Sequence, residues 1–201
     1  VEEPVDGFVI DLVRGDVLIE IQTRGFSSMK RKLSRLLEER RVHVVHPVAV
    51  DKWIVKLDAD GDVQSRRRSP KHGEVLDVFG ELTSFPELIR HPNLTVEVLL
   101  VEEEEVRRHD PEKAWRRKGW VIEERRLLGV VDECVLDSAD ALLELLPSDL
   151  PAQFTTGDLA TALGRPRRLA QQMAYCLRHA EAIEAVGKDG NAVVYEPVGE
   201  A

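Results

Sequence analysis

The alternation of hydrophobic and polar positions near the start of the chain predicts a β-hairpin. Two runs rich in apolar and β-branched residues, Phe8–Val13 and Val17–Gln22, flank residues 14–16, which include a glycine and an aspartate. If the turn is centred on Gly15 and Asp16, Asp11 lies directly opposite Glu20. Because side chains alternate between the two faces of a strand, the two carboxylates share one face of this hairpin.

A helical period follows the hairpin. Apolar residues recur at helical spacing and predict one buried stripe, formed by Met29, Leu33, Leu36 and Leu37. Ser27 or Ser28 is expected to cap this helix. Beyond it the pattern predicts strands over 42–50 and 94–101, a hairpin joining 53–57 to 63–65, a basic loop over 66–73, short helices over 75–82 and 85–89, and a strand end at the acidic run 102–105. Alternating helices and strands predict a mixed α/β domain.

The last part of the chain has the order helix, sharp turn, helix and hairpin. Thr155 or Thr156 is expected to cap a first helix that ends at Gly164, and Pro166 suits the start of a second helix. The strands of the hairpin are expected over 182–186 and 192–195. This order resembles a winged helix-turn-helix domain.

The composition is that of a soluble globular chain with a charged surface. Of 201 residues, 43% are hydrophobic and 32% are charged. No apolar run approaches the roughly 18 residues that a membrane helix needs, so no membrane contact is expected. Cys134 and Cys176 form no CxxC pair, which argues against a zinc site or a disulfide framework and favours a reducing cytoplasm.

Opposite charges are segregated along the chain. The net charge of −9 argues against a simple nucleic-acid coat. However, residues 22–72 contain 13 basic and 6 acidic residues, and residues 73–110 contain 3 basic and 10 acidic residues. A local positive field can bind phosphate even when the whole chain is acidic. The alternative is that both segments are ordinary solvated faces.

The opposed carboxylates of the first hairpin predict a cation between its strands. Carboxylates directly opposite each other repel, so placing Asp11 and Glu20 in an otherwise apolar hairpin is costly unless a cation lies between them. Their hard oxygen atoms suit Mg²⁺ or Mn²⁺. The alternative is that this face is exposed to solvent and that the carboxylates keep the hairpin soluble.

These residues carry a resemblance to a known superfamily. Asp11, the run LIEIQ over Leu18–Gln22 and the basic amphipathic helix after it resemble the PD-(D/E)xK nucleases, which have the restriction-endonuclease-like fold. The resemblance covers residues 5–101 and implies a mixed sheet flanked by helices. By position it assigns Asp11, Glu20 and the backbone carbonyl of Ile21 as metal ligands, and it assigns Asp11, Glu20 and Gln22 as catalytic residues.

The resemblance implies Mg²⁺-dependent hydrolysis of DNA phosphodiester bonds. In that chemistry the metal polarises the phosphate and lowers the pKa of its bound water. Gln22 falls where lysine is usual and could only orient that water, and Asp6 is a rival for the role of Asp11. Basic side chains expected to contact backbone phosphates are Lys30, Arg31, Arg35, Arg67, Arg68 and Lys71.

The second C-terminal helix offers further candidates for DNA contact. Arg167, Arg168 and Gln171 lie at its start, where a recognition helix meets the major groove, and arginine and glutamine can read base edges. Residues 147–201 contain 5 basic and 7 acidic residues, which is poor for DNA binding, so a protein contact is the alternative.

We therefore expect three parts and one leading function. The parts are a nuclease-like domain over 1–110, a connector with an extended hairpin and a short helix over 111–146, and a winged helix-turn-helix domain over 147–201. The leading function is a nucleic-acid-processing protein that hydrolyses DNA with Mg²⁺, a metal-dependent endonuclease. The alternatives are a non-catalytic DNA-binding or regulatory protein on a nuclease-like scaffold, and a protein-interaction module. Whether the chain forms a homodimer is left open.

Overall fold

The chain divides into two compact units, each assembled from separate stretches of sequence. A computed structural model describes residues 3–58, 60–110, 112 and 119–199. The first unit combines Val1–His46, Leu76–Val98 and Cys134–Ala201, and the second combines Pro47–Val75 and Leu99–Glu133. The expected division at residues 110 and 146 stays a prediction.

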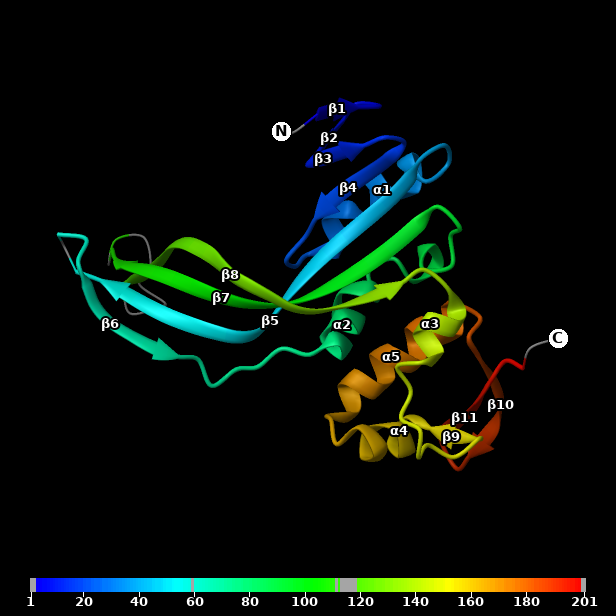
Figure 1. The fold of residues 1–201 in the computed structure, drawn as a ribbon. Coiled ribbons are helices and arrows are strands. Elements are labelled where there is room, and N and C mark those ends of the chain that lie inside the picture. The colour runs from blue at the N-terminus through cyan, green and yellow to red at the C-terminus, as the bar shows by residue number, and fades with distance from the viewer. Residues whose placement is uncertain (1–2, 59, 111, 113–118, 200–201) are drawn as a thin grey trace. The chain divides into compact units, whose positions relative to one another are not determined.

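The main sheet is mixed and contains six strands. Its order is β3-β4-β5-β7-β8, and β6 pairs with β5 beside this path (Figure 1). The bounds are β3 Leu12–Arg14, β4 Val17–Ile21, β5 Arg41–Leu57, β6 Val63–Arg68, β7 Leu94–His109 and β8 Trp120–Leu136. The fold class is therefore mixed α/β, as the alternation of helices and strands predicted. Among the described helices, none is long and apolar enough to cross a membrane.

The first hairpin has the expected turn and register. Leu12 pairs with Ile19 and Arg14 with Val17 in antiparallel β3 and β4. The run Phe8–Val13 is not one strand, however. It breaks at Asp11, and the preceding strand β2 (Phe8–Ile10) pairs with β1 (Glu3–Val5) in a separate two-stranded sheet.

A helical crossover joins β4 to β5, which run parallel with Leu18 beside Val42. The crossover contains the 3-10 helix η1 (Phe26–Met29) and α1 (Lys30–Leu36). The predicted stripe is confirmed, because Met29, Leu33, Leu36 and Leu37 are all buried. The predicted serine cap is wrong, since the N-cap residues of η1 and α1 are Gly25, which is in the left-handed region, and Met29, and neither helix has a side-chain cap.

The rest of the first unit is mainly helical. It contains η2 Val75–Asp77, which overlaps the boundary with the second unit, and then α2 Val78–Leu82, η3 Pro86–Leu88, α3 Ala139–Leu143, α4 Thr156–Leu163 and α5 Arg167–His179. A three-stranded sheet of order β10-β11-β9 follows, with β9 Phe154–Thr155, β10 Ile183–Asp189 and β11 Ala192–Pro197. Thr155 and Asp158 form a capping box at α4, which confirms the predicted cap.

Helices α2, α3, α4 and η3 of the first unit pack on α5. Leu169, Met173 and Leu177 are buried along its apolar face. Cys176 lies on the same face, 3.9 Å from the carbonyl oxygen of Phe79 on α2, and burial raises the pKa of its thiol to about 12. Cys176 is therefore a core residue, as its position on the apolar stripe predicted.

Three sequence predictions for the second unit are wrong. Arg66–Arg68 form the end of β6 and not a loop, because this segment pairs with Trp53–Val55 of β5. The acidic run Glu102–Glu105 lies within β7 and does not end it. Residues 120–136 form the single strand β8, so the hairpin expected there is absent from this described stretch.

One buried carboxylate holds strands of the second unit together. Glu105 on β7 is 4% exposed. Its carboxylate forms ion pairs with Arg107 at 2.5 Å, Arg125 at 3.6 Å and Lys52 at 3.9 Å. Burial alone would raise the pKa of Glu105. The hydrogen bond from Arg107 and the charges of Arg107, Lys52 and Arg125 outweigh it, so the pKa lies below its ordinary value.

This lowered pKa predicts a specific loss of stability in acid. The contribution of Glu105 is fully present above its unfolded pKa of about 4.3 and is lost as pH falls through the lower folded value. We expect the free energy of unfolding to fall less steeply between about pH 5 and pH 3 in Glu105→Gln than in the wild type, as measured by urea denaturation. The exposed Glu144→Gln serves as control and should keep the wild-type slope. Equal slopes for all three proteins would contradict the assignment.

Candidate functional site

The carboxylate face of the first hairpin is its buried face. On β4, Leu18 is 3% exposed and Glu20 is 6% exposed, whereas Ile21 on the opposite face is 53% exposed. The view that the carboxylates merely keep an exposed face soluble is therefore wrong for Glu20. A buried carboxylate needs a partner, because an isolated charge in the interior is strongly unfavourable.

That partner is Lys32, which α1 places against β4. Its Nζ lies 2.5 Å from Glu20 Oε1 and also donates a hydrogen bond to the carbonyl oxygen of Val9. Both side chains are largely buried, with 16% of Lys32 and 8% of Glu20 exposed. An ammonium group of the chain itself therefore neutralises Glu20. The metal ion expected between Asp11 and Glu20 stays a prediction. The sequence reasoning missed Lys32, although its position one residue before the buried Leu33 was a usable signal.

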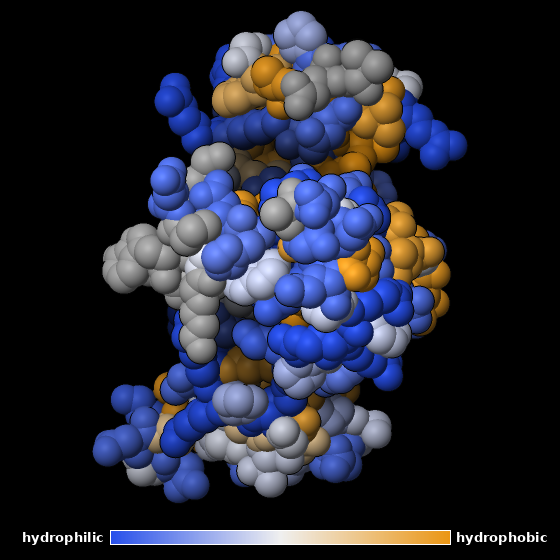
Figure 2. Space-filling model, turned by 90° about the vertical axis from the view of Figure 1, so that its left-hand side faces the viewer, coloured by the Kyte–Doolittle hydropathy of each residue, from blue (hydrophilic) through white to orange (hydrophobic). Residues whose placement is uncertain are grey.

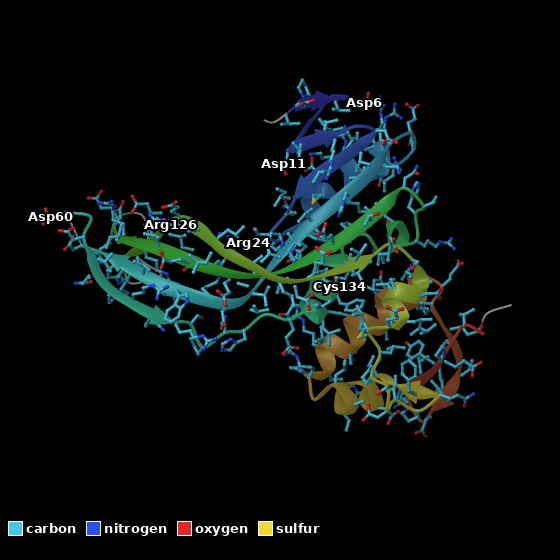
Figure 3. All side chains as sticks on the ribbon, viewed as in Figure 1. Asp6, Asp11, Arg24, Asp60, Arg126 and Cys134 are labelled. Carbon is cyan, nitrogen blue, oxygen red and sulfur yellow. The ribbon has the colours of Figure 1, made fainter. Side chains whose placement is uncertain are left out.

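Asp11 lies at the break between β2 and β3, one step beyond the pair of Leu12 and Ile19 (Figure 3). Its Oδ2 accepts a hydrogen bond of 2.8 Å from the backbone N–H of Ile21. Asp11 is thereby held next to the strand that carries Glu20. The metal-ligand roles that the resemblance implies for Asp11, Glu20 and the carbonyl of Ile21 stay predictions.

Gln22 is engaged with the backbone around it. Its Nε2 donates to the carbonyl oxygen of Arg24 at 2.7 Å, and its own carbonyl oxygen lies 2.7 Å from Nδ1 of His46. The ring of His46 packs edge-on against Phe26. Gln22 therefore helps to fix the chain where it leaves β4, and Lys32 is the basic group beside Glu20.

The oxygen atoms of Asp11, Glu20 and the Ile21 carbonyl are the kind of ligand that a hard divalent cation prefers. Two carboxylates and a backbone carbonyl are ligands that Mg²⁺ accepts with water completing its shell. Across the described ranges, no cluster of three or more His, Cys, Asp or Glu residues is placed to hold a metal. One oxygen of Glu20 is bound by Lys32, so a metal would have to compete with that ammonium group.

The basic residues predicted on α1 are only partly available for phosphate. Lys30 Nζ lies 2.5 Å from Glu87, and Arg35 lies 2.9 Å from Glu38. Arg31 and Arg35 line a surface hollow of about 430 Å³, together with Asp6, Phe8, Ser34 and Glu38.

The basic residues predicted in the second unit lie on β6 and just after it. Arg68 forms an ion pair with Asp51, and its hydrogen bond holds the pKa of that carboxyl below the ordinary value. Arg66 lies 2.9 Å from Glu104, and its guanidinium packs 4.0 Å from the ring of Trp53. Arg67 and Lys71 make no ion pair with the part of the chain that the structure describes.

A second candidate surface lies between α5 and β11. Exposed residues Arg167, Gln171, Tyr175 and Arg178 recur at helical spacing along α5. They line a groove of about 360 Å³, and its other lining residues are Thr156, Asn191, Ala192, Val193 and Tyr195. We call it the α5–β11 groove.

The groove contains only part of the predicted set. Arg167 and Gln171 line it, whereas Arg168 is exposed beside it. Tyr175, Arg178 and Asn191 were missed, although the spacing 167, 171, 175, 178 marks one helix face in the sequence. Arg165 lies 3.1 Å from Asp77, which anchors the loop before α5 to the start of α2.

The protein is a mixed α/β protein with a buried Glu20–Lys32 ion pair, with Asp11 hydrogen-bonded to the neighbouring residue Ile21, and with a separate groove lined by Arg167 and Arg178. The chain belongs to the family described as "Domain of unknown function (DUF8091)", whose sequence model matches residues 1–137. A protein of Treponema pallidum (strain Nichols), described as uncharacterized, is 31% identical over 160 residues. The match covers 79% of this chain and 64% of that protein, so the chain spans less than two thirds of its relative's length. No solved structure matches the chain.

The Glu20–Lys32 pair generates a stability prediction. Lys32→Met leaves a buried carboxylate without its cation and should lower the free energy of unfolding by about 3–5 kcal/mol. The double variant Glu20→Gln/Lys32→Met should recover a large part of that loss, because the uncompensated charge is gone. Urea denaturation of the single and double variants measures this coupling. If Lys32→Met and the double variant lose the same free energy, the ion pair does not have this role.

Proposed function

We propose that this chain is a nucleic-acid-processing protein that hydrolyses DNA phosphodiester bonds with Mg²⁺. The observation that carries the proposal is the position of Lys32, whose Nζ lies 2.5 Å from Glu20. Asp11 is held beside β4 by its hydrogen bond from the backbone N–H of Ile21. The proposal takes Asp11, Glu20 and Lys32 as the acidic and basic groups of a PD-(D/E)xK site, with Lys32 on α1 acting as the lysine that is absent at position 22. A restriction-endonuclease-like core followed by a winged helix is the finer fold that this proposal implies.

The chain's own residues have distinct roles in this proposal. Asp11, Glu20 and the carbonyl of Ile21 would hold Mg²⁺, which when bound polarises a phosphate and lowers the pKa of its water. Lys32 neutralises Glu20 before the metal arrives and supplies positive charge beside a phosphate whose own charge rises during the reaction. The hydrogen bond from Ile21 orients Asp11 and fixes one of its oxygens.

The α5–β11 groove is the surface that suits DNA in this proposal. Arg167 and Arg178 offer charge to phosphates, Gln171 offers an amide to base edges, and Tyr175 offers an aromatic face. All four lie on one exposed helix face, so a duplex could meet them together. The groove suits DNA better than the arginines of β6, where Arg66 and Arg68 already bind carboxylates.

A non-catalytic DNA-binding protein is the second candidate, and one observation favours it. The Glu20–Lys32 pair is closed, with 8% and 16% of the two side chains exposed. A charge pair that satisfies itself inside the protein leaves little of either group for a substrate. In this alternative the pair only stabilises the fold, and the groove alone carries the function.

Nuclease assays separate the two candidates. With Mg²⁺ or Mn²⁺ and duplex, single-stranded or branched DNA, we expect cleavage by the wild type. Asp11→Asn and Glu20→Gln should lose activity about 100-fold or more, because several kcal/mol of metal-dependent stabilisation disappear. Asp16→Asn, which alters an exposed carboxylate in the turn of the same hairpin, should keep wild-type activity. The absence of cleavage with every DNA and both metals would exclude the hydrolase and leave the second candidate.

DNA binding is predicted separately from cleavage. Arg167→Ala and Arg178→Ala should each weaken DNA binding at all sequences and reduce the slope of log affinity against log salt by about one, as expected for a lost phosphate contact. Fluorescence anisotropy at several salt concentrations measures both quantities. Arg14→Ala removes an exposed arginine outside the groove and serves as control. Equal effects of all three substitutions would show that the groove is not the DNA-binding surface.

A further inference from the structure

Among the strands that the structure describes, β8 forms an open edge of the main sheet. It is the last strand in the order of the sheet and pairs with β7 on one side only (Figure 1). In the second unit, residues 123–128 and 130–133 of this strand are exposed, and this run includes both faces of the strand. An edge strand presents unpaired backbone N–H and C=O groups, which are a template for another strand.

The exposed part of this edge is unusually apolar for a surface strand. Leu127 is 65% exposed, Leu128 47%, Val130 52% and Val131 59%. Figure 2 shows that on the face it presents apolar residues reach the surface only in limited patches among hydrophilic ones. A contiguous apolar run on an open edge is a surface that proteins normally cover or blunt with charge.

The sequence of this edge is complementary to itself when it is read in the opposite direction. Residues 125–133 read RRLLGVVDE. Gly129 lies at the centre of this run. The two leucines before it correspond in position to the two valines after it, and the two arginines correspond to the aspartate and the glutamate. In an antiparallel pair with Gly129 opposite Gly129, the facing residues are Arg125 and Glu133, Arg126 and Asp132, Leu127 and Val131, and Leu128 and Val130.

We propose that β8 pairs antiparallel with β8 of a second copy of this chain, with Gly129 of each copy on the two-fold axis. Every contact then occurs twice, as in an isologous dimer. Four oppositely charged pairs flank four apolar pairs, and both kinds of cross-strand pair are favourable. Within the chain Arg125 also lies 3.6 Å from Glu105 and Arg126 lies 2.7 Å from Glu124, so in the dimer each arginine is shared between that carboxylate and the acidic residue of the second copy. This proposal is independent of the hydrolase activity.

The complementarity selects this arrangement over its alternatives. A parallel pair in register would place arginine beside arginine and acid beside acid. A shift of the antiparallel register by one residue in one direction places Glu124 opposite Glu133, and in the other direction it places Leu127 opposite Asp132. Like charges or charge against leucine in directly opposite positions are unfavourable. A partner of unrelated sequence would share none of this symmetry.

The central glycine also suits the two-fold axis. Opposite residues in an antiparallel pair have Cα atoms about 4.5–5.5 Å apart, and two glycines allow the backbones to approach without a side-chain clash. Among the described residues, no heavy atom beyond the two chain neighbours lies within 4 Å of a Cβ built on Gly129, so no close contact in this part of the chain requires a glycine there.

Reciprocal charge reversal tests the pairing. Analytical ultracentrifugation of the whole chain should show a species of twice the 22.7 kDa chain mass. Asp132→Arg places two arginines opposite each other, and Arg126→Asp places two aspartates opposite each other, so each variant alone should weaken the dimer about tenfold or more. An equimolar mixture of the two variants should dimerise again, because each chain supplies the charge that the other lacks. Asp137→Arg, which alters an exposed aspartate just beyond β8, should leave the dimer unchanged.

Cysteine cross-linking tests the register itself. In a Cys134→Ser background, Gly129→Cys should form an intermolecular disulfide under mild oxidation, since opposite Cα atoms lie within the reach of a disulfide. Val131→Cys in the same background should not, because two such residues would be about 13 Å apart along the strands. Circular dichroism checks that each variant remains folded. A monomer at all concentrations, or a dimer that neither charge reversal weakens and that Val131→Cys links as readily as Gly129→Cys, would overturn the proposal.

Discussion

The ion pair between Glu20 and Lys32 is the contact on which the first hairpin, the crossover helix and the parallel strand pair jointly depend. Glu20 lies on the buried face of β4, where an unpaired carboxylate would cost several kcal/mol. The fold therefore has to place α1 with Lys32 above the strand. The same crossover returns the chain to run parallel to β4 as β5, with Met29, Leu33 and Leu36 sealing the interface. The buried charge thus adds a constraint on the local topology to the one that the apolar stripe imposes.

The Glu20–Lys32 ion pair also limits metal binding at the hairpin, and with it any metal-dependent chemistry there. An ammonium group and a metal ion compete for the same carboxylate oxygen, and both satisfy the cost of burying it. Lys32 lets the hairpin fold without metal, and Asp11 remains tied to the backbone of Ile21 in either state. Activity then depends on whether the energy of binding a divalent ion and a phosphate exceeds the energy of the closed pair. The ion pair that lets the hairpin fold without metal therefore also opposes the metal binding that catalysis would need.

Local patterns predicted the elements well, and contacts between elements explain what they missed. The turn at Gly15 determines the register of β3 and β4, and the stripe from Met29 to Leu37 determines the buried side of α1; both are short-range properties. Lys32 was not predicted as a site residue because its role depends on how α1 lies across β4. For a related reason β7 was predicted to end at residue 101, and β8 was predicted as a hairpin instead of one strand. Their charged residues resemble a solvated segment in the sequence, yet Glu105 is buried among three cations from other positions.

The segregation of charge along the chain has the same explanation, and it changes where a nucleic acid would be expected to bind. The basic segment 22–72 and the acidic segment 73–110 neutralise each other within each unit, as Lys30 does with Glu87, Lys52 with Glu103 at 2.7 Å, and Arg66 with Glu104. Charges used in this way contribute little field at the surface, because each pair is close to neutral beyond a few ångströms. The basic N-terminal segment is therefore a weaker candidate for phosphate than its composition implies. The α5–β11 groove lies in a region that is slightly acidic overall, yet its arginines at 167 and 178 make no ion pair within the described chain. Local availability of charge, rather than its total, favours the groove.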